Sequence, residues 1–266
     1  MSVTSFIPNL WESKIIEEYQ TITVADLITT RPSRVEGNKV VFNRASVTTG
    51  LQDYNGTVSY EDINTTAVEL LLNNKKYFAV KLDDVDAVQV AGELMNPVVR
   101  NLAYELKANG DKFVFGKAIA GVQEDMKVKP TAAIASAEMA YDLIVDLGTK
   151  LDEKSVPVMG RYVIAHPEFV NLLAKDVRVI DNAQVLANGI VQGMEVNGMT
   201  IIKSPLMEKG KVLCVHPDAI GYAIQLDKLE ALRLEGSFSD AVRGLQVYGG
   251  EVLRKEAIAL SEYTMV

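Results

Sequence analysis

The sequence contains two histidines, and both occur in the same local pattern. His166-Pro167-Glu168 follows the apolar run Tyr162–Ala165, and His216-Pro217-Asp218 follows the apolar run Val212–Val215. Two imidazoles could serve as bases or as metal ligands, but a zinc site needs at least three protein ligands and no others cluster near them. Proline at a first helical position with an acid after it is a helix-start signal. We therefore interpret both histidines as turn residues between a strand and a helix.

Three carboxylates and one thiol are the other groups that could carry chemistry. Asp83, Asp84 and Asp86 could form an acid–base or metal cluster, but no second carboxylate motif accompanies them, and acids so placed favour a helix start. Cys214 has apolar neighbours, which favour a buried thiol over a nucleophile, and a single cysteine cannot form an intrachain disulfide. The chain has no nucleophile-elbow, dinucleotide or phosphate-loop motif. The sequence predicts no catalytic residue, no metal site and no cofactor.

Composition restricts the class of protein. The chain has 266 residues, 48% of them hydrophobic, which is enough for a sizeable core in one large domain or two ordinary ones. Lysine and arginine total 27 against 35 acids, so the formal net charge is −8. An acidic chain without a basic run binds nucleic acid and anionic membranes poorly. The N-terminus lacks a signal-peptide pattern, and no apolar run approaches the ~18 residues of a membrane helix. We expect the protein to be made in the cytoplasm and to stay there, or in something assembled there.

The segment Asp83–Gly110 predicts a long helix around which the rest of the chain is organised. Its apolar residues recur at the three-and-four spacing of one helix face. The three aspartates stand at its start, and Asn109-Gly110 has the character of a left-handed C-cap. Pro97 lies inside the segment and predicts a kink near residues 93–96, or two separate helices.

Two segments before this helix have too little apolar surface to form a core of their own. Residues 1–35 predict an extended arm with one short helix, in which Trp11, the only tryptophan, anchors the arm against a larger body. Residues 38–82 predict strands, with turn-forming residues at 50–56. The first two of these strands are polar on both faces, so the hairpin they form has little to bury and is marginal alone. Both segments imply contacts with a partner.

The second half of the chain predicts a compact α/β unit after a boundary at Lys129-Pro130. Residues 112–123 before the boundary predict a short strand and turn, and residues 131–149 predict a helix. The two His-Pro-acid turns each follow a strand, with helical stretches expected to Lys175 and to Gln225. Asn197-Gly198 is a strong hairpin signal. From Leu229 onwards the tail predicts mostly strand, with turns at 235–240 and at 248–250.

Five segments resemble the major capsid proteins of tailed bacteriophages, and they occur in the family's order. The matching segments are FIPNLWESKI at 6–15, Asp53-Tyr54-x-Gly56-Thr57 with Tyr60, Lys76–Ala79 with Leu82–Asp86 and Gln89, YVIAHPEF at 162–169, and FSDAVRGLQVYG at 238–249. They resemble, in turn, the arm motif, the hairpin, the strand that feeds the spine helix, the entry to the axial domain and the closing strands of the peripheral domain. One departure is visible, since the family often has proline in its final strand where this chain has Arg254–Ala257.

The resemblance implies an α+β phage major-capsid fold with four parts. These are an N-terminal arm (1–35), an extended β-hairpin loop (36–75), a peripheral domain with the long spine helix (76–130 and 236–266), and an axial α/β domain (131–235). It also implies a structural protein, not an enzyme, whose copies form the hexamers and pentamers of an icosahedral shell around double-stranded DNA. The expected location is the virion capsid, assembled in the bacterial host cytoplasm and not on a membrane. Because no long extension precedes the arm, we expect a separate scaffolding protein, together with a portal and a decoration protein.

The same resemblance places the candidate site at contacts between subunits. The hairpin of one subunit is expected to lie across the spine helix of its neighbour, and the arm to pack against a peripheral domain. The interface residues expected on this basis are Trp11, Arg44, Asp53, Tyr54, Glu61, Asp62, Arg100 and Lys107. Two alternatives remain open: an encapsulin shell, which shares the fold and encloses cargo protein, and an α/β enzyme built on the axial-type unit.

Overall fold

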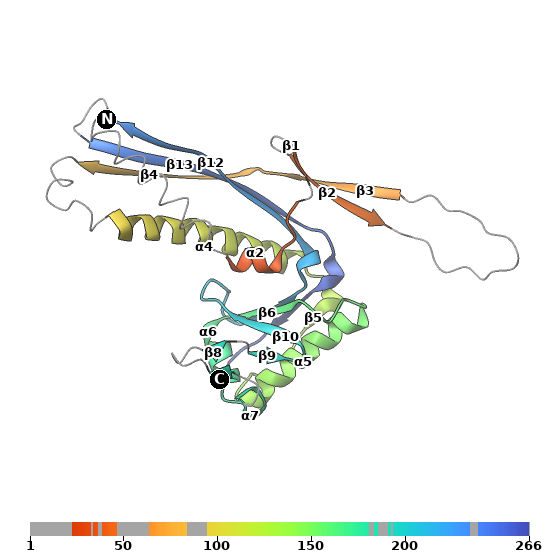
Figure 1. Ribbon diagram of the computed structural model, residues 1–266. Coiled ribbons are helices and arrows are strands. Elements are labelled where there is room, and N and C mark those ends of the chain that lie inside the picture. The colour runs from red at the N-terminus through yellow and green to blue at the C-terminus, as the bar shows by residue number, and fades with distance from the viewer. Residues whose placement is uncertain are drawn as a thin grey trace, which may run out of the picture.

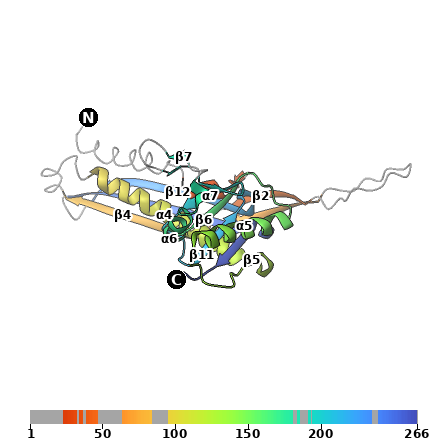
Figure 2. The same ribbon diagram turned by 90° about the horizontal axis from the view of Figure 1, so that it is seen from below.

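The structure is a computed structural model that describes residues 23–32, 34–36, 39–46, 64–83, 95–180, 184–185, 191–192, 194–234 and 239–265. Figure 1 shows a long sheet with the helix α4 along one face, and a second sheet with its own helices below them. A narrow β-hairpin extends sideways from the junction of these two layers. From below, the second sheet and its helices lie in front of the middle of the molecule (Figure 2).

The long sheet consists of β12 (Ile220–Arg233), β13 (Ser239–Val252) and β4 (Asn74–Asp83) in the order β12-β13-β4, all antiparallel. The helix α4 (Met95–Gly121) has 27 residues, so it is about 40 Å long. It packs on the sheet through Phe113, whose ring meets that of Tyr248 edge-on at 5.0 Å between centroids. The buried Gln246 donates from Nε2 to the carbonyl oxygen of Leu106 at 3.1 Å. These contacts fix α4 to the sheet.

The long helix is confirmed, but its boundaries differ from those predicted. Asp83 ends β4 and does not start a helix, while Asp84 and Asp86 lie outside the described residues. Pro97 lies in the first turn of α4, where a missing N–H breaks no helical hydrogen bond. The expected end at Asn109-Gly110 is wrong, and so is the strand expected over 112–123, because α4 continues to Gly121.

A six-stranded sheet forms the second layer of the described residues, in the order β5-β14-β11-β6-β10-β9. Its strands are β5 (Lys127–Val128), β14 (Ile258–Glu262), β11 (Lys211–Val215), β6 (Arg161–Ala165), β10 (Met199–Lys203) and β9 (Glu195–Val196). It is flanked by α5 (Ala137–Glu153), α6 (Pro167–Leu173) and α7 (Val177–Ile180). The strand β14 comes from the segment 236–266, which the sequence assigned to the peripheral domain, but it pairs with β11 and β5 here.

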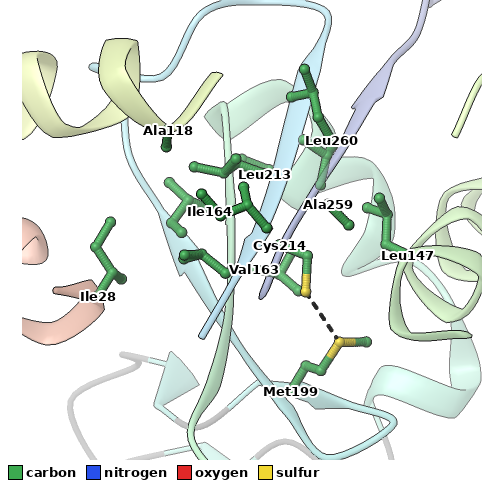
Figure 3. Close-up of a cluster of buried hydrophobic side chains, with 14 of the residues drawn as sticks. Ile28, Ala118, Leu147, Val163, Ile164, Met199, Leu213, Cys214, Ala259 and Leu260 are labelled. Carbon is green, nitrogen blue, oxygen red and sulfur yellow. Dashed lines mark hydrogen bonds between the residues drawn. The ribbon is translucent and has the colours of Figure 1, made fainter. Parts of the chain in front are cut away.

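Apolar strands fill the centre of this second layer (Figure 3). Val163 and Ile164 of β6, and Leu213 and Cys214 of β11, are fully buried. The thiol of Cys214 lies 3.4 Å from the sulfur of Met199, and burial raises the pKa of this thiol to about 12. Cys214 is therefore the inert core thiol that the sequence predicted.

In this half of the chain the structure confirms two local predictions and contradicts two others. Asn197 and Gly198 have φ of 51° and 72° and join β9 to β10, which confirms the hairpin turn. The helix after His166 is confirmed as α6. The helix expected after His216 is wrong, because a single 3₁₀ turn (η2, Pro217–Ala219) leads directly into β12. The turn expected at residues 248–250 is also wrong, since these residues lie inside β13.

The remaining elements are the hairpin, the short helix α2 and several short turns and strands. The hairpin consists of β2 (Lys39–Ser46) and β3 (Asn64–Leu71), with β1 (Arg34–Glu36) on the outer edge of β2. The short helix α2 (Val24–Ile28) lies beside α4. Two 3₁₀ turns, η1 (Glu124–Met126) and η3 (Lys255–Ala257), and the pair β7 (Gln184–Val185) and β8 (Val191–Gln192) complete the description. In the part of the chain that the structure describes, no helix is long and apolar enough to span a membrane.

Candidate assembly surfaces

The spine helix exposes a polar stripe along its N-terminal half. Arg100 and Tyr104 are exposed, Lys107 is half-buried, and their spacing of four and three residues places them on one side of α4. The Tyr104 side chain is 57% exposed, which is unusual for a large aromatic residue on a packed helix. We call Arg100, Tyr104 and Lys107 the spine stripe. The sequence predicted its two cations but missed Tyr104, although its position four residues after Arg100 could have indicated it.

One turn further along α4, a buried carboxylate fixes α2 onto the spine helix. Asp111 is 7% exposed, and its Oδ1 accepts a hydrogen bond from the backbone N–H of Ala25 at 2.8 Å. Burial raises the pKa of Asp111 above its ordinary value, the backbone N–H of Ala25 opposes this rise, and the charge of nearby Asp26 adds to it. The sequence missed this role, because Asp111 follows the glycine that was expected to end the helix.

The helix α2 is also fixed at its two ends. Thr23 and Asp26 form a capping box, in which the hydroxyl of Thr23 accepts from the N–H of Asp26 at 3.2 Å. After the helix, Thr30 donates its N–H to the carbonyl oxygen of Ile220 at 2.8 Å and accepts from the N–H of Tyr222 at 3.3 Å. The chain between residues 23 and 30 is thus held against both α4 and β12.

The hairpin is anchored by an apolar base. Val40, Phe42, Leu70 and Leu72 are each at most 4% exposed, and they pack against β12 and β13 through residues such as Val247. We call these four residues the hairpin base. The prediction that both strands are polar on both faces is therefore wrong at this end, because alternate residues of β2 and β3 face the long sheet.

Beyond its base, the hairpin carries one described interface candidate. Arg44 lies on β2, opposite Thr66 of β3 in the antiparallel register, and Figure 1 shows these strands pointing away from the rest of the molecule. The other candidates on the arm and the hairpin lie outside the described residues. They are Trp11, Asp53, Tyr54, Glu61 and Asp62.

A buried arginine organises the turn after α5, and no sequence pattern predicted it. Arg161 is 1% exposed, and its guanidinium donates to the carbonyl oxygens of Val156 at 2.6 Å, Pro157 at 2.8 Å and Gly148 at 3.4 Å. Its Nη2 also lies 2.7 Å from Oδ1 of Asp152. Because most of its partners are backbone carbonyls, no pairing of residue types could have revealed it.

The histidines have the local role that their pattern predicted. Nδ1 of His166 accepts from the N–H of Glu168 at 3.4 Å, and Nδ1 of His216 accepts from the N–H of Asp218 at 3.3 Å. Each imidazole therefore caps the turn that follows it. Within the described ranges, no three His, Cys, Asp or Glu side chains gather in a way that could hold a metal ion.

Comparison by sequence finds no match for the chain, whereas comparison by structure finds several. No protein-family model matches the chain, and no curated protein matches it by sequence. A structure from Mycobacterium phage Che8 is similar, with 29% identity, a TM-score of 0.65 and 85% of each chain covered. The capsid of cyanophage P-SCSP1u is similar at 17% identity, with a TM-score of 0.69 over 92% of this chain and 89% of that one.

The chain has the tailed-phage major-capsid fold. An encapsulin complex from Synechococcus elongatus PCC 7942 shares this capsid fold at 14% identity, with a TM-score of 0.59 over 91% of this chain and 88% of that one. The predicted fold class and family resemblance are thereby confirmed. The solved structures with this fold include phage capsids and an encapsulin complex, so the spine stripe and the hairpin are candidate assembly surfaces.

Proposed function

We propose that the chain is the major capsid protein of a tailed phage, whose copies form the hexamers and pentamers of an icosahedral shell around double-stranded DNA. The observation that carries this proposal is the 29% identity to the Mycobacterium phage Che8 structure over 85% of both chains. The encapsulin that shares the fold is only 14% identical. The phage-type shell is therefore the better supported of the two, and an enzyme built on the second layer has no site among the described residues to support it.

The partners of such a shell protein are first of all further copies of itself. In the proposed virion they also include a separate scaffolding protein, a portal and a decoration protein, during and after assembly in the host cytoplasm. The net charge of −8 suits a wall that confines DNA, because a strongly basic lining would bind the packaged phosphates in place. The DNA is enclosed without sequence-specific contacts.

The hairpin of one subunit lies across the spine stripe of the next in this proposal. Asp53, Glu61 and Asp62 on the hairpin would face the cations of the stripe, and Tyr54 and Tyr104 would supply apolar area to the same contact. An exposed ion pair contributes up to about 1 kcal/mol, so one such contact is weak. The stability of the shell comes from repetition around closed rings, in which every subunit gives and receives one hairpin.

The content of purified particles tests the proposal against its rival. The chain is expressed with its neighbouring genes, and particles are collected by sedimentation and treated with nuclease before extraction. The proposal predicts megadalton particles that protect double-stranded DNA. Particles that instead hold a specific cargo protein and no DNA would support the encapsulin alternative. A small oligomer that forms no particles would contradict both types of shell.

A further inference from the structure

A groove runs between α2, α4 and β12, next to the point where the N-terminal segment enters the described structure. It consists of two adjoining hollows of about 430 Å³ and 40 Å³ that share Asp26, Tyr222 and Ile224. Thr23, the first described residue, lines the smaller hollow. We call the two hollows together the α2 groove.

The floor of the α2 groove is apolar and its rim is charged. Among the described residues, the apolar lining of the larger hollow comes from Ile224, Tyr222 and Pro32, together with the almost fully buried Val40, Leu72 and Ala223; Thr29 and Gln225 add polar groups. Two cations and one carboxylate stand on the rim: Lys107, Arg31 and Asp26. Arg31 is 81% exposed and its Nη2 is 3.9 Å from Oδ1 of Asp26, so this pair is loose. The rim therefore favours an occupant with more acids than bases.

The walls of the groove are fixed before anything binds. The hydrogen bond between Ala25 and Asp111 holds α2 on α4, and the two backbone bonds of Thr30 hold the following residues on β12. The hairpin base closes the far side through Val40 and Leu72. A preformed groove of this size falls in the range of about 300–1,000 Å³ that is usual for pockets holding compact apolar groups.

We propose that the segment Leu10–Tyr19 of the same chain docks in the α2 groove, with the indole of Trp11 on the apolar floor. This segment, LWESKIIEEY, is apolar at Leu10, Ile15 and Tyr19 and carries three glutamates against one lysine. Its acidic balance matches the cationic rim, and its apolar residues match the floor.

The length of the connecting chain selects the same subunit over a neighbour. Four residue steps separate Tyr19 from Thr23, which span at most about 14 Å. The segment is therefore confined close to the groove of its own subunit, where its effective concentration is far above that of a segment from another copy. Docking in the free subunit would pre-order the arm, and would lower the entropy lost when shells assemble. This docking belongs to the unassembled subunit and does not require shell formation.

Trp11 reports on its own position, because it is the only tryptophan in the chain. Its emission maximum and its quenching by acrylamide are measured in the dilute unassembled subunit and in a peptide of residues 1–22. We expect a blue-shifted emission and quenching several-fold slower than in the peptide, both independent of subunit concentration. Quenching as fast as in the peptide, or protection that appears only as subunit concentration rises, would overturn the proposal.

Two variants and a matched control assign the protection to the groove. Ile224→Asp places a charge on the floor, and Lys107→Glu reverses a cation on the rim without touching the core. Both should shift the emission to the red and speed up quenching, with the larger change for Ile224→Asp. Lys112→Glu makes the same charge change at an exposed position of α4 and should change neither the emission nor the quenching.

Urea unfolding of each variant shows whether it is folded. If Ile224→Asp does not fold, Lys107→Glu still tests the proposal. Protection of Trp11 that survives in a folded groove variant would place the arm elsewhere and contradict the inference.

Discussion

Arg161 is the first residue of β6, and its side chain holds the turn that follows α5. Its guanidinium donates to three backbone carbonyl oxygens, those of Gly148, Val156 and Pro157. Replacing it with Met should lower the free energy of unfolding of the subunit by roughly 1.5–3 kcal/mol, the scale for losing hydrogen bonds to a charged group. Asp152 is 51% exposed, so Asp152→Asn should cost no more than about 1 kcal/mol. Urea unfolding of both variants measures this, and equal costs would contradict a role based on the carbonyls.

Asp111 gives the junction of α2 and α4 a dependence on pH. Its pKa is raised above 3.8 in the folded protein, so the folded state binds this proton more tightly than the unfolded state does. The contribution of Asp111 to the free energy of unfolding therefore falls as pH rises from 3.8 through the raised pKa. Asp111→Asn keeps an oxygen that can accept from Ala25 but has no proton to lose. Relative to the parent, this variant should gain stability as pH rises from 3.8 through the raised pKa.

The control for this prediction is Asp111→Ala, which removes the acceptor altogether. It should be less stable than the parent by about 1–3 kcal/mol, because the N–H of Ala25 is left without its partner. Urea midpoints across the pH range give both comparisons. The stability difference between the Asn variant and the parent should grow with pH. If it is the same at low and at high pH, Asp111 does not titrate as argued.

Two glycines show why elements were predicted more reliably than their ends. Gly110 was expected to end the spine helix, yet a Cβ there would lie 2.6 Å from the hydroxyl of Tyr222. Gly250 was expected in a turn, yet a Cβ there would lie 3.0 Å from the ring of Phe113. Both glycines permit close packing between α4 and the long sheet. Local pattern cannot separate a glycine needed for a turn from one needed for a close contact, because the contact partner lies far away in sequence.

The hairpin combines a fixed base with a polar far part, and amide exchange should separate the two. Amides of Val40, Phe42 and Leu70 should already be protected in the unassembled subunit, since the hairpin base is buried against the long sheet. Amides of residues 44–63 should become protected only in assembled shells, where a neighbour covers them. Hydrogen exchange measured on both forms tests this. Equal protection of residues 44–63 in subunits and shells would contradict the proposed contact.

Reversing a charge in the spine stripe should weaken assembly and leave folding unchanged. Arg100→Glu places an acid opposite the acidic hairpin of a neighbour, so each contact should lose up to about 1 kcal/mol, or about fivefold in affinity. The critical subunit concentration for assembly should rise accordingly, as measured by light scattering. Lys112→Glu, on another side of α4, is the matched control and should assemble like the parent. If both variants behave alike, the stripe is not the contact surface.

At the scale of the whole molecule, five short segments in order predicted the capsid fold, and the structure confirms it. What they could not predict is how distant segments pair. The final strand β14 was assigned to the peripheral domain with its sequence neighbours, but it inserts between β5 and β11 of the other layer. The apolar sequence of β14 indicates that the strand is buried, but it does not indicate which sheet the strand joins. The interface residues are harder still to predict, because their partners belong to another copy of the chain.

Electron cryomicroscopy of purified particles shows both the assembly and the contact between its subunits. We expect closed icosahedral shells of hexamers and pentamers, in which each hairpin crosses the spine helix of a neighbouring subunit near Arg100 and Lys107. A deletion of residues 44–63 closed by a short turn should leave a folded subunit that forms no closed shells. Small oligomers from the intact chain, or normal shells from the deletion, would contradict the account.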